Sequence, residues 1–305
     1  MRLDPPVLDN MSPAVLNPLP HEVASFGPVH LEVTDLGRST DFWHRVVGLR
    51  LRKGSSREVQ LGTAGETLVT LHPGAKHGFL RGHSGLYHLA IHPPSEVEFA
   101  RIIKRVLAAG WRLSPVDHTM SKAVYLLDPD GITVEITLET PSRLRAMTAT
   151  PASMHAIHAD GRFRAGSEPL DLAPILATLE GAEQKNLVAE GTRIGHVHLY
   201  VGDLLAAYQF YRTLGFNQAL WAPGIGFGDL GAGGAFNHRI AVNTWAGVGA
   251  PQSPEGTARM RNFTITLDSK ERLNEVLEQL PHIPVEGASG YSVEDPAGNR
   301  ILLNQ

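Results

Sequence analysis

The sequence contains an internal repeat with a constant offset of 168 residues, from position 27 to position 195. Gly27–Leu36 (GPVHLEVTDL) matches Gly195–Leu204 (GHVHLYVGDL), and Phe42–Trp43 matches Phe210–Tyr211. A looser match joins Gly85–Ile91 with Thr257–Ile265, and the turn Asp128–Gly131 with Asp295–Gly298. Self-similarity of this kind indicates that one supersecondary unit is used repeatedly. We therefore predict four modules of about fifty residues each, in the order A-B-A′-B′.

Each module is predicted to contain a strand, a helix and three further strands. Apolar and polar residues alternate over 196–201, as expected for a half-buried first strand. Apolar residues at helical spacing predict helices over 96–107 and 270–280. Short strands are expected at 123–127 and 133–138, on either side of an Asp-Pro-Asp-Gly turn. This pattern predicts an α+β fold.

Two histidines and one glutamate are candidate metal ligands. The apolar neighbours of Glu135 can pack against helices, which leaves Glu135 on the opposite, concave face of a sheet; the same argument places His88 there. The chain has no cysteine, so imidazole, carboxylate or water must hold any metal. With His196, these residues provide the two imidazoles and one carboxylate that bind Fe(II) on one face in non-heme oxygenases.

The motifs resemble a known superfamily. The patterns G-H-V-H-L-x-V-x-D-L, G-L-Y-H-L-A and D-H-x-x-S-x-A-x-Y-L-x-D-P-D-G-x-x-x-E are similar to those of the vicinal oxygen chelate superfamily, which includes glyoxalases and extradiol dioxygenases. Within it, the chain resembles bacterial catechol 2,3-dioxygenases, over residues 25–305. The resemblance implies four βαβββ modules that form two open-barrel units with U-shaped sheets. We expect an N-terminal arm (1–26), a first glyoxalase-like domain (27–140), a linker with one helix at 172–179 (141–192) and a second glyoxalase-like domain (193–305).

The positions of the candidate ligands predict how the modules pair. In the superfamily, each module can supply one ligand from its first strand and one from its last. The resemblance gives the first-strand positions as Pro28, His88, His196 and Asn262, and the last-strand positions of modules two and four as Glu135 and Leu302. Pairing in sequence order would separate the three ligands. We therefore predict that modules 2 and 3 pair, as do modules 1 and 4, because this arrangement collects all three ligands in one cavity.

The resemblance also implies three catalytic residues around the metal. His238 would be the acid–base residue, and His118 and Tyr125 would form hydrogen bonds to the reacting oxygens. Each has a structural alternative: a surface histidine, a turn histidine and a core aromatic residue. We interpret His30 and His198 as structural or cavity-lining residues and assign no role to His72, His77, His83, His155 and His158 in turns or the linker. We expect Arg239 and Lys122 to face solvent, with recognition of an anionic ring substituent as the alternative.

The function that this resemblance implies is extradiol cleavage of a small aromatic diol by O2 at an Fe(II) centre, with Mn(II) as the alternative metal. Glyoxalase-type isomerases are the first alternative class, but they typically use four protein ligands, and residues 240–245 of module three contain Asn243 and no acid. A metal-free binding protein of the bleomycin-resistance type is the second. An inactive paralogue would also retain these ligands.

Bulk composition indicates a small-molecule partner. The net charge of −4 and the pI near 6.4 give no basic surface for nucleic acid or an acidic membrane. The first 26 residues lack the pattern of a signal peptide, and no apolar run reaches transmembrane length. We therefore expect a cytoplasmic homo-oligomer.

Overall fold

The structure is a computed structural model that describes residues 20–183, 185–280 and 284–305. The predicted N-terminal arm falls largely outside these residues. Its described part does not remain free of the fold, because the first strand begins at Ala24. None of the helices in the described ranges is both long and apolar enough to cross a membrane.

Four modules follow the predicted order of strand, helix and three strands. Module one contains β1 (Ala24–Val33), α1 (Leu36–Asp41) continued by a π-helical turn (Phe42–Val47), β2 (Arg50–Gly54), β3 (Val59–Gly62) and β4 (Thr67–Pro73). Module two contains β5 (Gly85–His92), α2 (Glu96–Ala108), β6 (Ser114–Asp117), β7 (Ser121–Leu127) and β8 (Thr133–Glu139). Module three contains β13 (Arg193–Tyr200), α4 (Leu204–Thr213), β14 (Asn217–Ala222), a 3₁₀ turn (Pro223–Ile225), β15 (Phe227–Gly231) and β16 (Ile240–Asn243). Module four contains β17 (Arg259–Leu267), α5 (Lys270–Gln279), β18 (Val285–Gly287), β19 (Gly290–Glu294) and β20 (Arg300–Asn304).

The helices begin at equivalent places because each module carries a capping residue after its first strand. The side chains of Asp35, Ser95, Asp203 and Ser269 each accept a hydrogen bond from a backbone N–H three residues later. These contacts satisfy N–H groups that have no partner inside the helix. Local sequence therefore determines where each helix starts.

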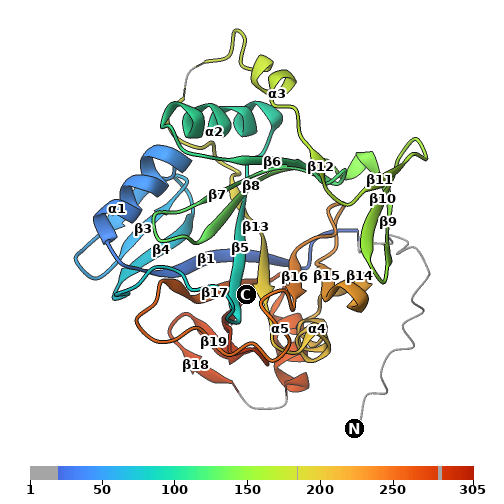
Figure 1. Cartoon of the computed structure of the whole chain (residues 1–305). Helices are drawn as coiled ribbons and strands as arrows, with labels where there is room; N and C mark the ends of the chain where they lie inside the picture. Colours follow the sequence, from blue (N-terminus) through green and yellow to red (C-terminus); the bar gives the residue numbers. More distant parts are fainter. Residues whose placement is uncertain (1–19, 184, 281–283) are drawn as a thin grey trace.

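Strand pairing confirms the predicted exchange of modules. In each module the first strand runs parallel to the last, as in β5 with β8 and β13 with β16. Between modules, β5 pairs antiparallel with β13, and β1 pairs antiparallel with β17. Figure 1 shows β5 and β13 side by side at the centre of the molecule and β1 beside β17. Modules 2 and 3 thus form one unit, and modules 1 and 4 form the other.

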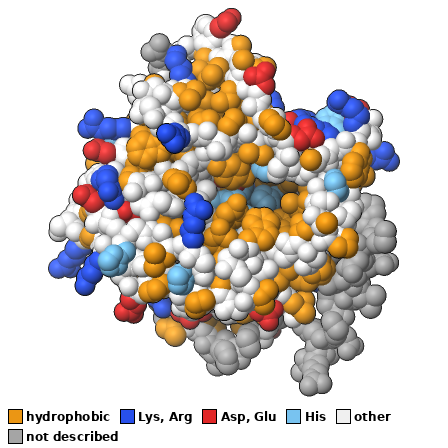
Figure 2. All heavy atoms as spheres, viewed as in Figure 1, with side chains coloured by type: hydrophobic (Ala, Val, Ile, Leu, Met, Phe, Trp, Pro, Cys, Tyr) orange, Lys and Arg blue, Asp and Glu red, His pale blue; other side chains and the backbone are white. Residues whose placement is uncertain are grey.

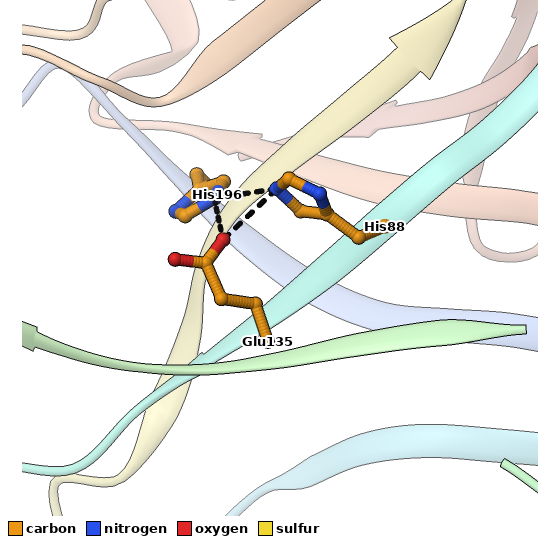
Figure 3. Close-up of side chains that lie close together, drawn as sticks. All are labelled: His88, Glu135 and His196. Carbon is orange, nitrogen blue, oxygen red and sulfur yellow. Dashed lines mark hydrogen bonds and ion pairs between the residues drawn. The ribbon is translucent and has the colours of Figure 1, made fainter. Parts of the chain in front are cut away.

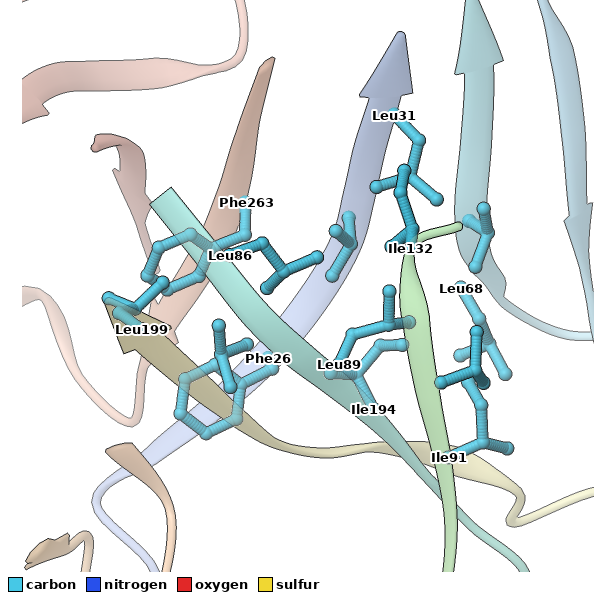
Figure 4. Packing of buried hydrophobic residues seen from close by; sticks show 14 of the residues in the cluster. Phe26, Leu31, Leu68, Leu86, Leu89, Ile91, Ile132, Ile194, Leu199 and Phe263 are labelled. Carbon is cyan, nitrogen blue, oxygen red and sulfur yellow. The ribbon is translucent and has the colours of Figure 1, made fainter. Parts of the chain in front are cut away.

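One hydrophobic core runs through both units. It is formed by the apolar faces of the first and last strands, and Figure 4 labels ten of its residues: Phe26, Leu31, Leu68, Leu86, Leu89, Ile91, Ile132, Ile194, Leu199 and Phe263. The helices cover this face with fully buried side chains such as Trp43 and Phe99. Because strand side chains alternate, the opposite faces remain available for polar residues.

The connector between the halves is more than a linker with one helix. A 3₁₀ turn (Pro141–Arg143) leads into a three-stranded antiparallel sheet of β9 (Leu144–Thr150), β10 (Ser153–His158) and β11 (Phe163–Ala165), followed by β12 (Glu168–Pro169) and α3 (Ala173–Ala177). The predicted helix is present but shorter. The strands were missed because they are stabilised by distant partners: Met147 and Ala156 pack with Leu220 and Phe227 of module three.

Candidate metal centre

His88 of β5, Glu135 of β8 and His196 of β13 converge on one point (Figure 3). The two histidine Nε2 atoms are 3.1 Å apart, and each is 2.9 Å from Oε2 of Glu135. All three residues are at most 3% exposed. Two pairings produce this geometry: the antiparallel pair β5–β13 brings the histidines together, and the parallel pair β5–β8 places Glu135 opposite Ala90.

A buried hydrogen-bond chain fixes the protonation of His196. Oε1 of Glu139 lies 2.8 Å from His92 Nδ1, and His92 Nε2 lies 2.9 Å from His196 Nδ1. Burial lowers the pKa of His92 to about 4, and its ring is therefore neutral at pH 7. A carboxylate only accepts, so the His92 proton lies on Nδ1 and His92 Nε2 accepts from His196 Nδ1–H. His196 Nε2 is left with a lone pair directed at His88 and Glu135.

The donor set fits a divalent metal ion. Burial holds the pKa of His196 well below its ordinary value, and the pKa of Glu135 is also well below its usual range because the two imidazoles outweigh the effect of burial. Neutral imidazole and ionised carboxylate are the ligand states that a metal requires. Ligands at right angles, roughly 2.1 Å from a shared metal, lie about 3 Å apart, close to the observed spacing.

The three predicted catalytic residues surround this point. His238 Nδ1 lies 2.7 Å from Asp229 Oδ1, and its ring centre is 4.3 Å from that of His196. Burial lowers the pKa of His238, but the charge and hydrogen bond of Asp229 outweigh it and raise the net value. His118 and Tyr125 are joined by a contact of 3.0 Å between Nε2 and the phenol oxygen. Burial, reinforced by the charge of Glu135, raises the pKa of Tyr125 well above its ordinary value, so its hydroxyl stays protonated.

These side chains line a cavity of about 350 Å³ together with His88 and Glu135. Figure 2 shows histidines within a hollow that is surrounded largely by hydrophobic side chains. The connector contributes to this cavity through Met147, Met154, Gly166 and Ser167. The carbonyl oxygen of Gly166 accepts from His118 Nδ1 at 2.9 Å, which leaves Nε2 of a neutral His118 to accept from Tyr125.

Comparison with known proteins identifies the family. The family model for the Glyoxalase/Bleomycin resistance protein/Dioxygenase superfamily matches residues 25–136. A catechol-2,3-dioxygenase from Bacillus subtilis (strain 168) is 30% identical over 279 residues, which cover 90% of this chain and 92% of the relative. The chain belongs to this superfamily. It is the same vicinal oxygen chelate superfamily that the sequence motifs indicated.

Solved structures share the superfamily fold. A Bacillus subtilis protein provisionally called a dioxygenase has a TM-score of 0.57 and 12% identity, with 93% of this chain and 85% of that chain covered. Glyoxalase I from Zea mays has a TM-score of 0.54 and 16% identity, with coverage of 93% and 92%. At these identities the similarity establishes the fold.

Sequence reasoning within the superfamily missed several residues of the site. His92, Glu139 and Asp229 orient the histidines described above, and none had been assigned a role. His92 left a detectable signal, since it lies four residues after His88 on the same face of β5. Glu139 left the same signal, since it lies four residues after Glu135 on the same face of β8, but its contact with His92 depends on how β8 lies beside β5.

Two expectations about charged and histidine side chains were wrong. Arg239 does not face solvent: it is 1% exposed, and its guanidinium donates to Glu22, Glu139 and the Gly195 carbonyl. His72 does not lie in a turn but on β4, where its Nε2 is 2.9 Å from His30 Nδ1. Lys122 is partly exposed and paired with Glu96 at 2.6 Å.

Proposed function

We propose that the protein is a non-heme Fe(II) extradiol dioxygenase that cleaves catechol-type aromatic diols. The observation that carries this proposal is the convergence of His88, Glu135 and His196 at the wall of a cavity also lined by His238, His118 and Tyr125. A divalent iron held by the three ligands would supply a Lewis-acidic, redox-active centre with open positions for the diol and O2.

The number of ligands supports an oxygenase over an isomerase. Strand register gives the position in module three that corresponds to Glu135. Glu135 lies opposite Ala90, and the equivalent pair in module three is Ala241 opposite His198. Alanine cannot bind a metal, so the site has no fourth protein ligand at that position. Fewer protein ligands leave more positions for reactants.

His238 is suited to move a proton. Its Nδ1–H donates to Asp229, so Nε2 is the basic nitrogen of the neutral ring, and the nearby carboxylate stabilises the ring once it is protonated. We assign it the acceptance of a proton from a diol hydroxyl and its later return to an oxygen of the product. Its raised pKa favours the protonated state that this return requires.

His118 and Tyr125 are suited to hold the reacting oxygens. The Gly166 carbonyl fixes the His118 ring, whose Nε2 can accept a hydrogen bond, and Tyr125 can turn its single O–H from that nitrogen to a reacting oxygen as negative charge develops there. The apolar side of the cavity restricts water, which strengthens both contacts. These residues therefore position the reacting oxygens, and Tyr125 does so as a neutral hydroxyl.

The test is anaerobic reconstitution with Fe(II), in parallel with Mn(II), followed by measurement of bound metal. Catechol and O2 are then added while oxygen uptake and yellow ring-cleavage product are recorded. We expect stoichiometric uptake of oxygen. Absence of uptake with a panel of catechols, together with turnover of a methylglyoxal–thiol adduct, would instead identify an isomerase. Absence of both metal binding and turnover would favour a binding protein.

A further inference from the structure

We propose that the cavity selects catechols with an uncharged, apolar ring substituent, and that the hairpin formed by β9 and β10 is the wall that makes this selection. The inference rests on the proposed dioxygenase function and specifies its substrate class. It is carried by the charge, size and construction of the cavity.

The lining of the cavity has a polar side and an apolar side. The polar side is formed by the candidate ligands and the three candidate catalytic residues. The apolar side is formed by Val116, Met120, Met147, Met154, Phe227 and Trp245. No lysine or arginine is among the described residues that line the cavity, and its only acidic residues are Glu135 and Asp229. A carboxylate on the ring would therefore lose its hydration, and the one lining histidine with a raised pKa, His238, is already paired with Asp229.

Two arginines that flank the hairpin are engaged with other residues, and Arg145, on β9, is exposed and is not among the residues that line the cavity. Arg143 donates to Asp117 at 2.6 Å, and Arg164 contacts Asp117 at 3.3 Å and Glu168 at 2.5 Å. Lys122, which follows the lining residue Ser121, is paired with Glu96 at 2.6 Å. A substrate carboxylate would have to compete with these acidic partners, which makes recruitment of a cation unfavourable.

The cavity is larger than an unsubstituted catechol needs. At roughly 30 Å³ for each water-sized group, 350 Å³ holds about a dozen such groups, whereas catechol has only eight non-hydrogen atoms. With the two hydroxyls at the polar side, the remaining space lies against the methionines and aromatic rings. An apolar substituent would bury its surface there, and the gain in binding would grow with the apolar area that is removed from water.

The hairpin wall is separate from modules 2 and 3, which form the metal site. Met147 lies on β9 and Met154 on β10, and the hairpin packs against Leu220 and Phe227 of module three. Methionine is unbranched and polarisable, so it adapts to substituents of different shape. A change in this wall can therefore alter which substituent is accepted without moving His88, Glu135 or His196.

The first experiment compares two catechols that differ in charge and in one methyl group, 3,4-dihydroxyphenylacetate and its methyl ester, with catechol as the reference. We expect kcat/KM for the ester to exceed that for the carboxylate at least tenfold, mainly through KM, and to equal or exceed that for catechol. Equal or better turnover of the carboxylate would overturn the inference while leaving the dioxygenase function intact.

Binding separates failure of the inference from failure of the proposed function. Affinities of the ester and the carboxylate are measured by calorimetry on the Fe(II)-loaded protein without O2. If catechol gives no oxygen uptake, the proposed function fails. The inference on charge then depends on these affinities alone: tighter binding of the ester supports it, and equal binding contradicts it.

A matched pair of variants tests the hairpin. Met154→Lys adds a cation inside the cavity, whereas Ala152→Lys adds the same charge at the exposed turn of the same hairpin. We expect Met154→Lys to shift the ester-to-carboxylate ratio of kcat/KM toward the carboxylate at least tenfold with unchanged iron content, and Ala152→Lys to leave the ratio unchanged. Equal shifts in both variants, or none in Met154→Lys, would contradict a wall at this position.

Discussion

The unit of modules 2 and 3 and the unit of modules 1 and 4 have the same architecture, but among the described residues only the first carries a candidate metal site. Strand register identifies the equivalent positions in the second unit. Pro28 and Asn262 stand on its first strands where the first unit has histidines, and Thr70 and Leu302 stand on its last strands. The described residues of modules 1 and 4 form no group of three metal-ligating side chains.

The apolar faces of the two units are equivalent. Leu89, Val197, Val29 and Phe263 occupy the same register position in the four modules, and all are fully buried. On the polar face of modules 1 and 4, His30 contacts His72, and Glu32 contacts Arg259 and Arg261 at 3.4 and 3.5 Å. The fold therefore depends on the faces that both units share, and the chemistry depends on the face that differs.

The largest expected effect separates the two units directly. His88→Ala should abolish iron binding and turnover, with a loss larger than the roughly 100-fold that removal of an outer partner causes. The equivalent change in the other unit, Asn262→Ala, should keep wild-type iron content and activity. Metal analysis and oxygen uptake after anaerobic reconstitution measure both. Equal losses of iron and activity in the two variants would show that metal binding is not confined to the unit of modules 2 and 3.

His238→Gln should separate proton transfer from metal binding within the first unit. We expect iron content close to wild type and a fall in kcat of about 10² to 10⁴, because an acid–base residue contributes on this scale. His72→Gln, which changes a histidine of the other unit, is the control and should leave kcat unchanged. Loss of iron from His238→Gln would instead make His238 a metal ligand.

Core substitutions should lower the stability of the protein to a similar extent in the two units, whereas only the first unit should affect catalysis. Phe263→Ala in modules 1 and 4 is expected to lower the free energy of unfolding by about 3–5 kcal/mol, and Leu89→Ala in modules 2 and 3 by about 2–5 kcal/mol, because each leaves a cavity in the shared core. Urea denaturation of the metal-free variants measures both. A loss below about 1 kcal/mol for Phe263→Ala would argue against a shared core.

His92→Ala should weaken metal binding in the first unit although His92 is not itself a candidate ligand. The change removes the acceptor of His196 Nδ1–H and should reduce iron affinity about 10- to 100-fold. His30→Ala removes a half-buried histidine from the other unit and should leave iron affinity unchanged. Competition with a chelator gives both affinities. Unchanged affinity in His92→Ala would show that the chain from Glu139 does not orient the ligand.

The smallest expected effect concerns the ion pairs that hold Glu22 beside the first unit. Burial raises the pKa of Glu22, but Arg193 and Arg239 outweigh it and lower the net value. Because the pKa of Glu22 is lower in the folded state than the value near 4.5 in the unfolded chain, ionised Glu22 stabilises the fold at pH values above 4.5. This stabilisation is lost as pH falls through the pKa of the folded state. Glu22→Gln should therefore destabilise by up to about 1 kcal/mol at pH 7 and by less at pH 3. Urea denaturation of both proteins at the two pH values measures this difference in the free energy of unfolding. A larger difference at pH 3 than at pH 7 would contradict a lowered pKa for Glu22.

Much of the architecture could be predicted because it has a local signal. The alternation of apolar residues and the capping residues lie within a few positions of the structure they specify, and the 168-residue repeat shows the same local pattern twice. Module pairing, which is not local, was predictable for a different reason: three ligands need one cavity, and a single pairing brings His88, Glu135 and His196 together. The strand pairing of β5 with β13 agrees with that requirement.

The sequence by itself thus determined the four modules, their pairing and the residues that meet at the candidate metal site. Only the tertiary structure decided that the connector forms a wall of the cavity, that His92 and Glu139 orient His196, and that Arg239 is buried. The physical reason is distance along the chain. Periodicity and capping act between near neighbours, whereas a buried polar group takes its partner from whichever strand the packing of the whole core places beside it.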